Sequence, residues 1–511
     1  MRRSAWLWSA ALALAACSDD GNGGSGTTSD DPGTGSGATA TTGAATTSVD
    51  TTGSGGAATS GSEDSTTGAV STCPTKSSTW ASHSRDPENS RHVPDETILT
   101  SRTVADLTEV WSLSPLDGAT STPVVRDGVV YIADWSGDAH ARCLADGSEI
   151  WTTDVSTDAN ASLLVTDDMV YVPDGNGFLH GLQRDTGEIV WSVELDAHPQ
   201  ANLYSSPVLA GGMLVIGVAS TELATVVDDY VFRGSIVALD PATGDEQWRT
   251  YTTTNDANAG AGVSVWSSAA VDESLGLLFI GSGNTYEEPA APLSDSLLAL
   301  DIMTGEIVWN TQFTTGDVYT VFGGEGGPDS DVGASPNLFE IDGQAVVGVG
   351  DKAGNYMVLD RETGEQVWMQ SLAPGSPLGG VMTTAAVGEG TIFVATNTWN
   401  ELFSFGDPTN TATLFALQAS NGAVQWQVEV DQPVFGAITL AADVVYHGDT
   451  SGRVYARSAL DGSELWSAEP GGDIGGGFSV VDGKLLVTHG FWFFTAPAKP
   501  NGGLVAYGLP Q

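Results

Sequence analysis

Short apolar segments alternate with turn residues along most of this chain. In TPVVRDGVVYIAD (122–134) and FSVVDGKLLVTHG (478–490), two apolar stretches flank a polar turn, and in ADVVYHGDT (442–450) an apolar stretch lies between turn residues. Apolar stretches of this length around a turn are typical of paired β-strands. No segment has sustained helical periodicity, so the pattern predicts an all-β protein.

A second pattern shows that these strands belong to a repeat. An apolar strand leads to a glycine, and a tryptophan follows four residues later, as in IVALDPATGDEQW (236–248). The pairs are Gly147–Trp151, Gly187–Trp191, Gly244–Trp248, Gly305–Trp309, Gly364–Trp368, Gly422–Trp426 and Gly462–Trp466. Each predicts a hairpin whose turn places glycine in a left-handed conformation. With two further strands, each unit of roughly 40 residues becomes a four-stranded propeller blade.

The number of tryptophans predicts eight blades. Trp111, in VADLTEVW, starts the series without a preceding turn, and the C-terminal LVAYGL (504–509) has no tryptophan after it. We expect these two unpaired strands to join in one blade, which would close the ring and remove its free edges. The eight tryptophans are expected to pack between blades and not to hold a cofactor.

The N-terminal region differs from the repeats. Residues 1–16 combine two arginines with an apolar stretch too short to span a bilayer, which predicts a signal peptide. Its end, Leu14-Ala15-Ala16-Cys17, resembles a bacterial lipobox, which implies lipidation of Cys17. Ser18 after it favours the outer membrane. An ordinary signal peptide with an incidental Cys17 is the alternative.

Residues 17–75 are predicted to form a disordered tether, because their Gly, Ser, Thr, Ala and Asp cannot bury enough apolar area to order themselves. Residues 76–511 form the propeller. Cys73 and Cys143 could pair in an oxidising compartment, which the sequence leaves open. The net charge of −47 argues against nucleic acid or an anionic membrane surface as a partner. We expect a monomer.

The repeat ALDxxTGExxW resembles that of pyrroloquinoline quinone (PQQ) dehydrogenases. Non-enzymatic propellers also carry it, including the scaffold lipoprotein of the outer-membrane barrel assembly machinery. Other segments are similar to polyvinyl-alcohol dehydrogenases, in the same order from about Trp80 to the C-terminus. They include WASHSRDPENSR (80–91), FRGSIVALD (232–240), VWSSAAVDESLGLLFIGSGN (265–284) and GPDSDVGASP (327–336).

This resemblance implies a set of site residues. Glu222, Asn284 and Asp317 would hold Ca²⁺, for which oxygen ligands are suited, and Asp317 would also act as the general base. Lys352 would lie against the quinone oxygens and stabilise charge that develops on reduction. The ring of PQQ would stack on Trp266. Arg233 would lie near the cofactor carboxylates.

Four of these residues also have a plain structural interpretation. Glu222 could be a surface residue, Asn284 could occupy a left-handed turn, Asp317 could be an ordinary loop residue, and Lys352 could be a solvated turn lysine. The chain also departs from the family. Residues 228–232 read DDYVF where relatives carry an adjacent cysteine pair, and no CxxCH is present, so no haem is expected.

Two classes of function follow. The first is a cell-envelope quinoprotein dehydrogenase that uses PQQ and Ca²⁺ to oxidise alcohols, with secondary or polymeric alcohols as candidate substrates and an external electron acceptor. The second is a non-catalytic propeller lipoprotein that acts as a scaffold or binds a polymer.

Overall fold

A computed structural model describes residues 73–74, 76, 78–254, 260–322, 327–401, 404, 407–490 and 501–510. All described residues lie within residues 72–511, which form one compact unit. The predicted signal peptide, Cys17 and all but Cys73 and Pro74 of the predicted tether lie outside them. No helix in the described ranges is long and apolar enough to cross a membrane.

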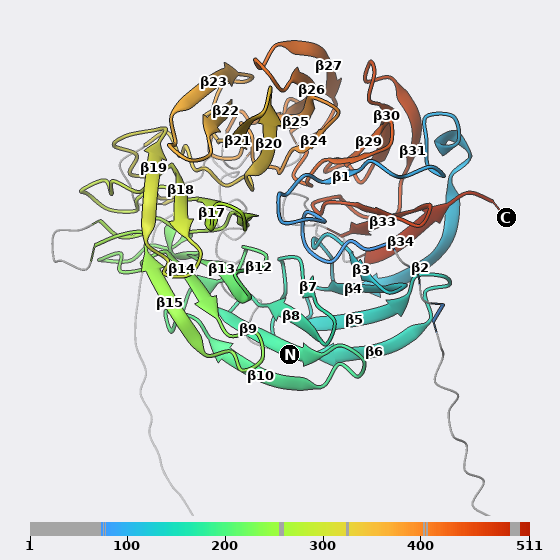
Figure 1. Cartoon of the computed structure of the whole chain (residues 1–511), viewed down its shortest axis with the longest axis horizontal. Coiled ribbons are helices and arrows are strands. Elements are labelled where there is room, and N and C mark those ends of the chain that lie inside the picture. The colour runs from blue at the N-terminus through green and yellow to red at the C-terminus, as the bar shows by residue number, and fades with distance from the viewer. Residues whose placement is uncertain are drawn as a thin grey trace, which may run out of the picture. The chain divides into compact units, whose positions relative to one another are not determined.

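The folded unit contains eight antiparallel sheets arranged in a ring (Figure 1), which confirms the eight-bladed propeller. Blade 1 comprises β3 (Val124–Arg126), β4 (Val129–Ala133), β5 (Asp138–Cys143) and β6 (Glu149–Asp154). Blade 2 comprises β7 (Leu164–Val165), β8 (Met169–Pro173), β9 (Phe178–Gln183) and β10 (Ile189–Glu194). Blade 3 comprises β12 (Val208–Ala210), β13 (Met213–Ser220), β14 (Ser235–Leu239) and β15 (Glu246–Tyr251), with the short β11 (Ala201–Asn202) also paired to β13. Blade 4 comprises β16 (Ala270–Asp272), β17 (Leu277–Gly281), β18 (Ser296–Asp301) and β19 (Ile307–Gln312).

The second half of the ring repeats this arrangement. Blade 5 comprises β20 (Asn337–Ile341), β21 (Gln344–Gly350), β22 (Asn355–Asp360) and β23 (Gln366–Ser371). Blade 6 comprises β24 (Ala386–Gly388), β25 (Thr391–Thr398), β26 (Thr411–Gln418) and β27 (Val424–Val430). Blade 7 comprises β28 (Thr439–Ala441), β29 (Val444–Gly448), β30 (Val454–Ser458) and β31 (Glu464–Ala468), with β1 (His92–Val93) parallel to β28. Two short 3-10 helices, η2 (Val104–Asp106) and η3 (Glu222–Ala224), interrupt the loops.

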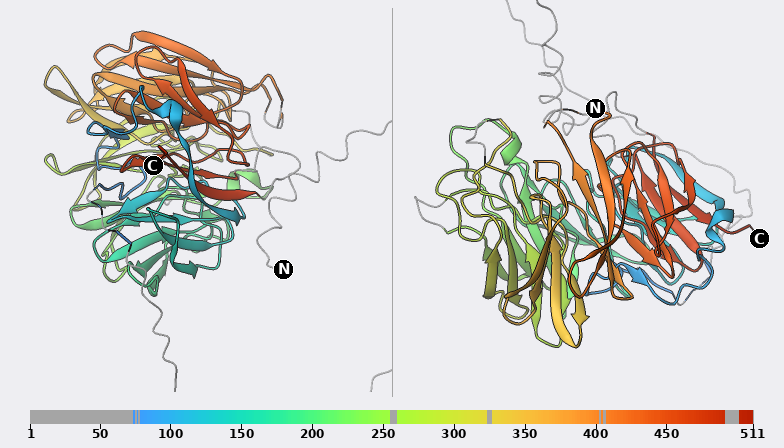
Figure 2. Two further views of the ribbon diagram at one scale, coloured as in Figure 1. Left: turned by 90° about the vertical axis from the view of Figure 1, so that its right-hand side faces the viewer. Right: turned by 90° about the horizontal axis from the view of Figure 1, so that it is seen from above.

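Blade 8 closes the ring with strands from both ends of the folded unit. It comprises β32 (Ser479–Val481), β33 (Lys484–His489), β34 (Gly502–Gly508) and the N-terminal β2 (Thr108–Leu116). β2 pairs antiparallel with β34, so that Trp111 faces Ala506. The blue β2 and the red β34 therefore lie side by side (Figures 1 and 2). The pairing predicted from the two incomplete repeats is confirmed.

Each repeat tryptophan joins its own blade to the next one. Trp111 Nε1 donates a hydrogen bond to Leu144 O at 3.0 Å, and Trp466 Nε1 closes the series on Leu107 O at 3.1 Å. The other six indoles make the same type of bond. Seven of the indole rings pack against the repeat glycine of the neighbouring turn, which has a left-handed φ. The tryptophans are therefore structural, as expected.

A crossing segment, residues 78–93, runs past the inner strands of most blades. Backbone carbonyls of this segment accept hydrogen bonds from Val125, Val165, Val271, Leu338, Val387 and Leu440, which belong to six different blades. Arg91, which is fully buried, adds bonds from its guanidinium to Ile438 O and to Phe478 O next to blade 8. The segment therefore holds seven of the eight blades to one stretch of backbone.

Cys73 and Cys143 form a disulfide, which settles the pairing that the sequence left open. It attaches the start of the folded unit to β5 of blade 1.

The contact between glycine and indole can be tested with Gly305→Ala. A Cβ at this position would overlap the Trp248 ring, and the backbone φ is +72°. Gly276→Ala is a matched control, because its φ is +68° and nothing lies within 4 Å of the new Cβ. We expect the control to lose about 1–2 kcal/mol of unfolding free energy from backbone strain. Gly305→Ala should lose about 1–3 kcal/mol more from overpacking, as measured by denaturant unfolding. Equal losses of unfolding free energy in the two variants would show that the contact between glycine and indole does not constrain the propeller.

Candidate functional site

Loops from one end of blades 3, 4 and 5 carry the residues that the sequence singled out. Glu222 follows β13, Asn284 follows β17 and Lys352 follows β21, while Trp266 and Asp317 lie in the loops that lead into β16 and β20. These positions share one end of the sheets, because consecutive antiparallel strands reverse direction. Isolated β-bridges join the loops in the order Arg233, Gly262, Thr285 and Val318.

Lys352 lies between two carboxylates that the sequence analysis did not assign. Its Nζ is 2.8 Å from Asp329 Oδ1, 2.9 Å from Asp331 Oδ2 and 5.5 Å from the centre of the Trp266 ring. Its side chain is only 8% exposed. Burial alone would lower the pKa of Lys352, but the two carboxylates together raise it above its ordinary value. The alternative of a solvated turn lysine is therefore wrong.

Asp331 is the residue on which the predicted set converges. Its Oδ2 accepts a hydrogen bond from Trp266 Nε1 at 3.2 Å, and its Oδ1 accepts one from the Asn284 backbone at 2.6 Å. One carboxylate thus orients the lysine, the indole and the asparagine loop. The available sequence signal was the segment GPDSDVGASP, in which Asp329 and Asp331 are the only ionisable residues.

Asn284 and Asp317 are both buried and both hold neighbouring loops. Asn284 Nδ2 donates to Thr285 O at 2.7 Å and to Tyr319 O at 2.8 Å, which leaves its Oδ1 as the acceptor of that side chain. Its backbone is not left-handed, so the turn interpretation is wrong. The Asp317 carboxylate accepts bonds from the backbone of Asp329 at 3.3 Å and Ser330 at 2.7 Å. Burial raises the pKa of Asp317, and the Ser330 amide opposes this increase.

Glu222 and Arg233 lie on the adjoining loop of blade 3. Glu222 is 2% exposed, so the surface interpretation is wrong. Its carboxylate accepts hydrogen bonds from the backbone of Val231 at 3.2 Å and Phe232 at 3.0 Å. Arg233 donates to Thr253 and stacks on Tyr251, with the guanidinium carbon 4.0 Å from the ring centre. The predicted roles of both residues toward a cofactor stay predictions.

Asp295 adds an unexpected carboxylate to this region. It is fully buried at a left-handed φ of +50°, and neither carboxylate oxygen has a hydrogen-bond partner of acceptable geometry. Burial raises the pKa of Asp295 to about 9, and the charges of Asp331 and Asp317 contribute. The nearby Ser294 hydroxyl lowers this pKa without forming a normal hydrogen bond.

This charge distribution fits a bound cation. Asp295, Asp317, Asp329 and Asp331 interact electrostatically around the single ammonium of Lys352. Carboxylate and amide oxygens are the ligands that Ca²⁺ prefers. In the described part of the chain, no three His, Cys, Asp or Glu side chains are arranged to hold a metal by themselves. A cation would therefore need other oxygens as well, and Asn284 Oδ1 is the candidate that the chain offers.

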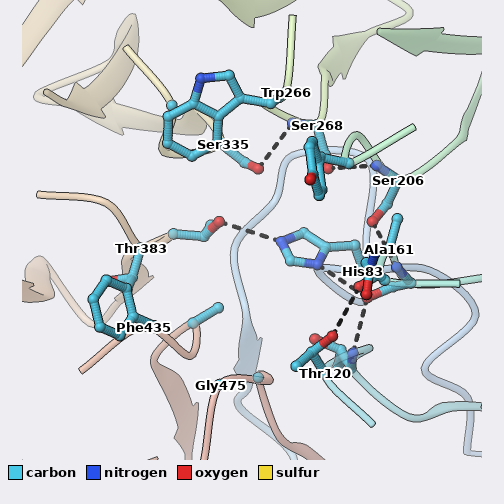
Figure 3. Close-up of a pocket in the computed structure, with 18 of the residues that line it drawn as sticks. His83, Thr120, Ala161, Ser206, Trp266, Ser268, Ser335, Thr383, Phe435 and Gly475 are labelled. Carbon is cyan, nitrogen blue, oxygen red and sulfur yellow. Dashed lines mark hydrogen bonds between the residues drawn. The ribbon is translucent and has the colours of Figure 1, made fainter. Parts of the chain in front are cut away.

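A cavity of about 140 Å³ adjoins Trp266 (Figure 3). Its lining includes Trp266, Ser206, Ser335 and His83 from the crossing segment. Burial lowers the pKa of His83 to about 3, so the imidazole is neutral. Its two nitrogens each lie 3.3 Å from a hydroxyl oxygen, one of Ser162 and one of Thr384. A side chain at Gly333 would overlap the Trp266 ring, so this glycine lets the indole lie against the backbone.

Comparisons with known proteins agree with the propeller fold. The family model described as outer membrane protein assembly factor BamB matches residues 95–315, 232–354 and 352–490. The solved quinohemoprotein alcohol dehydrogenase of Comamonas testosteroni superposes with a TM-score of 0.71 at 21% identity, over 84% of this chain and 80% of that one. BamB of Moraxella catarrhalis superposes with a TM-score of 0.55 at 16% identity, over 79% and 99%.

A curated relative matches at the sequence level. A polyvinylalcohol dehydrogenase of a Pseudomonas species is 28% identical over 342 residues, which cover 57% of this chain and 53% of that protein. The chain spans about half the length of the curated polyvinylalcohol dehydrogenases it matches.

The unpartnered Asp295 predicts a pH-dependent stability that Asp295→Asn removes. The unfolded chain releases this proton near its ordinary pKa of 3.8, whereas the folded chain keeps it up to about pH 9. Between these values the folded state binds more protons, so wild-type stability falls as the pH rises. With a chelator present, we expect the variant to melt at the wild-type temperature at pH 4 and several degrees higher at pH 8. A constant difference between the two melting temperatures across this range would contradict the assignment.

Proposed function

This chain belongs to the PQQ_2 family, described as outer membrane protein assembly factor BamB, and we propose that it is a quinoprotein alcohol dehydrogenase. It also matches polyvinylalcohol dehydrogenases. Its cofactors would be PQQ and Ca²⁺, and its candidate substrates are secondary or polymeric alcohols. The observation that carries the proposal is the convergence of Lys352, Trp266 and Asn284 on the Asp331 carboxylate. A scaffold has no evident use for a buried lysine between two carboxylates under an indole.

Individual residues of this chain would have separate roles in alcohol oxidation. When bound, PQQ with Ca²⁺ supplies a polarised carbonyl that accepts two electrons. Trp266 offers an indole fixed by its bond to Asp331 as the surface for a planar ring. The ammonium of Lys352, 5.5 Å from the centre of that ring, stabilises negative charge beside it. Asn284, Asp317 and Glu222 are the proposed oxygen donors for the cation.

The general base is better placed at Asp331 than at Asp317. Both carboxylates are buried and accept hydrogen bonds, Asp317 from the backbone of residues 329 and 330 and Asp331 from Asn284 N and Trp266 Nε1, so position decides between them. Asp331 contacts both Lys352 and Trp266, where the reacting carbonyl would lie. We therefore propose that Asp331 takes the hydroxyl proton of the alcohol. Asp317 would remain a cation ligand that also orders residues 327–331.

The non-catalytic alternative rests on two observations. The matching family model bears the name of an assembly factor, and residues 228–232 lack the adjacent cysteine pair expected from the resemblance. Under this interpretation, the propeller would bind a protein or polymer at the end that carries these loops. Lys352 would form a structural ion pair with Asp329 and Asp331.

Calorimetric titration of PQQ into residues 72–511, with and without Ca²⁺, distinguishes the two readings. We expect Ca²⁺-dependent binding together with dye-linked oxidation of a secondary alcohol. Asp331→Asn should lower kcat by about 10²–10⁴-fold, the usual contribution of a general base. Asp317→Asn should mainly weaken Ca²⁺ binding.

Asp461→Asn is the matched control for both changes, because this exposed carboxylate lies in a blade 7 turn. A larger loss of kcat in Asp317→Asn than in Asp331→Asn would show that Asp317 is the general base. Absence of PQQ binding at high micromolar concentration would favour the scaffold.

We also propose that the protein is exported, lipidated at Cys17 and anchored in the outer membrane, as a monomer that passes electrons to an external acceptor. The support is the lipobox-like Leu14-Ala15-Ala16-Cys17, and the disulfide between Cys73 and Cys143 is consistent with an oxidising compartment. Cys17→Ser should move the protein from the membrane fraction to the soluble fraction and abolish labelling by a fatty-acid analogue. Unchanged labelling would contradict the proposal.

A further inference from the structure

His198 contacts the proposed cation ligand Glu222 and has no assigned role. Its Nε2 lies 3.2 Å from Glu222 Oε1, and both side chains are largely buried, at 14% and 2% exposure. We propose that His198 is a positioning residue that fixes the orientation of the Glu222 carboxylate for cation binding. The inference rests on the proposed function, because it requires Glu222 to be a ligand.

The hydrogen bonds of His198 determine its tautomer. Its Nδ1 accepts a bond from the backbone N–H of Gln200 at 3.3 Å, so Nδ1 carries no proton. The N–H of the ring is therefore on Nε2, which lies 3.2 Å from Glu222 Oε1. Fixing one nitrogen in order to define the donor at the other is how residues behind a metal site orient its ligands.

The backbone around His198 is held against the strand that leads to Glu222. His198 N donates to Asp196 Oδ1 at 2.8 Å, and Thr221 N donates to Gln200 O at 3.0 Å. The short β11 then pairs with the end of β13, two residues before Glu222. The imidazole therefore approaches the carboxylate from a fixed direction.

The donors around Glu222 limit how it can bind a cation. Oε1 accepts a hydrogen bond from Val231 and lies 3.2 Å from His198 Nε2, whereas Oε2 accepts one bond, from Phe232. Oε2 is therefore the less crowded of the two oxygens. This arrangement favours coordination of the cation through Oε2. Loss of the His198 side chain would leave Oε1 less crowded and let the carboxylate turn.

The test measures Ca²⁺ affinity by calorimetry and Tb³⁺ luminescence on residues 72–511 with PQQ present. His198→Ala removes the donor, whereas His198→Gln places an amide N–H near the position of Nε2. We expect His198→Ala to weaken Ca²⁺ binding about 10–100-fold, the usual cost of losing such a partner. His198→Gln should restore affinity to within a few-fold of the wild type.

His180→Ala is the matched control, because its Nε2 makes a similar 3.1 Å contact with a carboxylate, that of Asp174 in blade 2. It should leave Ca²⁺ affinity unchanged, and melting curves should show that all variants fold. If Glu222→Ala loses Ca²⁺ binding but His198→Ala does not, the inference is overturned and the proposed function stands. Equal losses in His198→Ala and His198→Gln would also overturn it. If the wild type binds no Ca²⁺, or Glu222→Ala binds it normally, the proposed function fails and the inference fails with it.

Discussion

The ring depends on one pairing between strands from opposite ends of the folded unit. Seven blades are each built from consecutive strands, but blade 8 exists only because β2 hydrogen-bonds to β34. Without that pairing, β34 would present an unpaired edge, and Trp466 would lose its acceptor at Leu107. Every loop of the candidate site is positioned by blades whose mutual spacing this closure fixes.

Within that frame, the site brings four buried aspartates and one buried lysine together. Asp329 and Asp331 are matched to Lys352 at hydrogen-bonding distance, and the lysine therefore stays charged despite its burial. Asp295 has no such partner. A buried carboxylate without a donor is costly, so its presence among three others is more readily explained by a ligand than by stability.

The sequence predicted the fold well because the repeat is local. A left-handed glycine and a tryptophan four residues later define a hairpin wherever they occur. Seven such pairs together with Trp111 predict eight blades and identify the strands that close the ring. The site was less predictable because its contacts join distant loops. Asp331 accepts a hydrogen bond from Trp266, which lies 65 residues earlier in the chain. The sequence has no periodicity that would identify a residue whose role depends on a single contact of this kind. The resemblance placed Lys352, Trp266 and Asn284 in the right region, but it could not show that Asp331 links them or that Arg233 is engaged by Thr253 and Tyr251.

The crossing segment has a consequence for how the protein reaches its native state. Arg91 is made early in synthesis, yet its partner Phe478 lies 387 residues further along the chain. Contacts of such long range carry a large entropic cost before they form, and they slow folding. Neither the crossing segment nor β2 can complete its contacts until the last repeat has been synthesised. The ring can therefore close only after the last repeat has been synthesised.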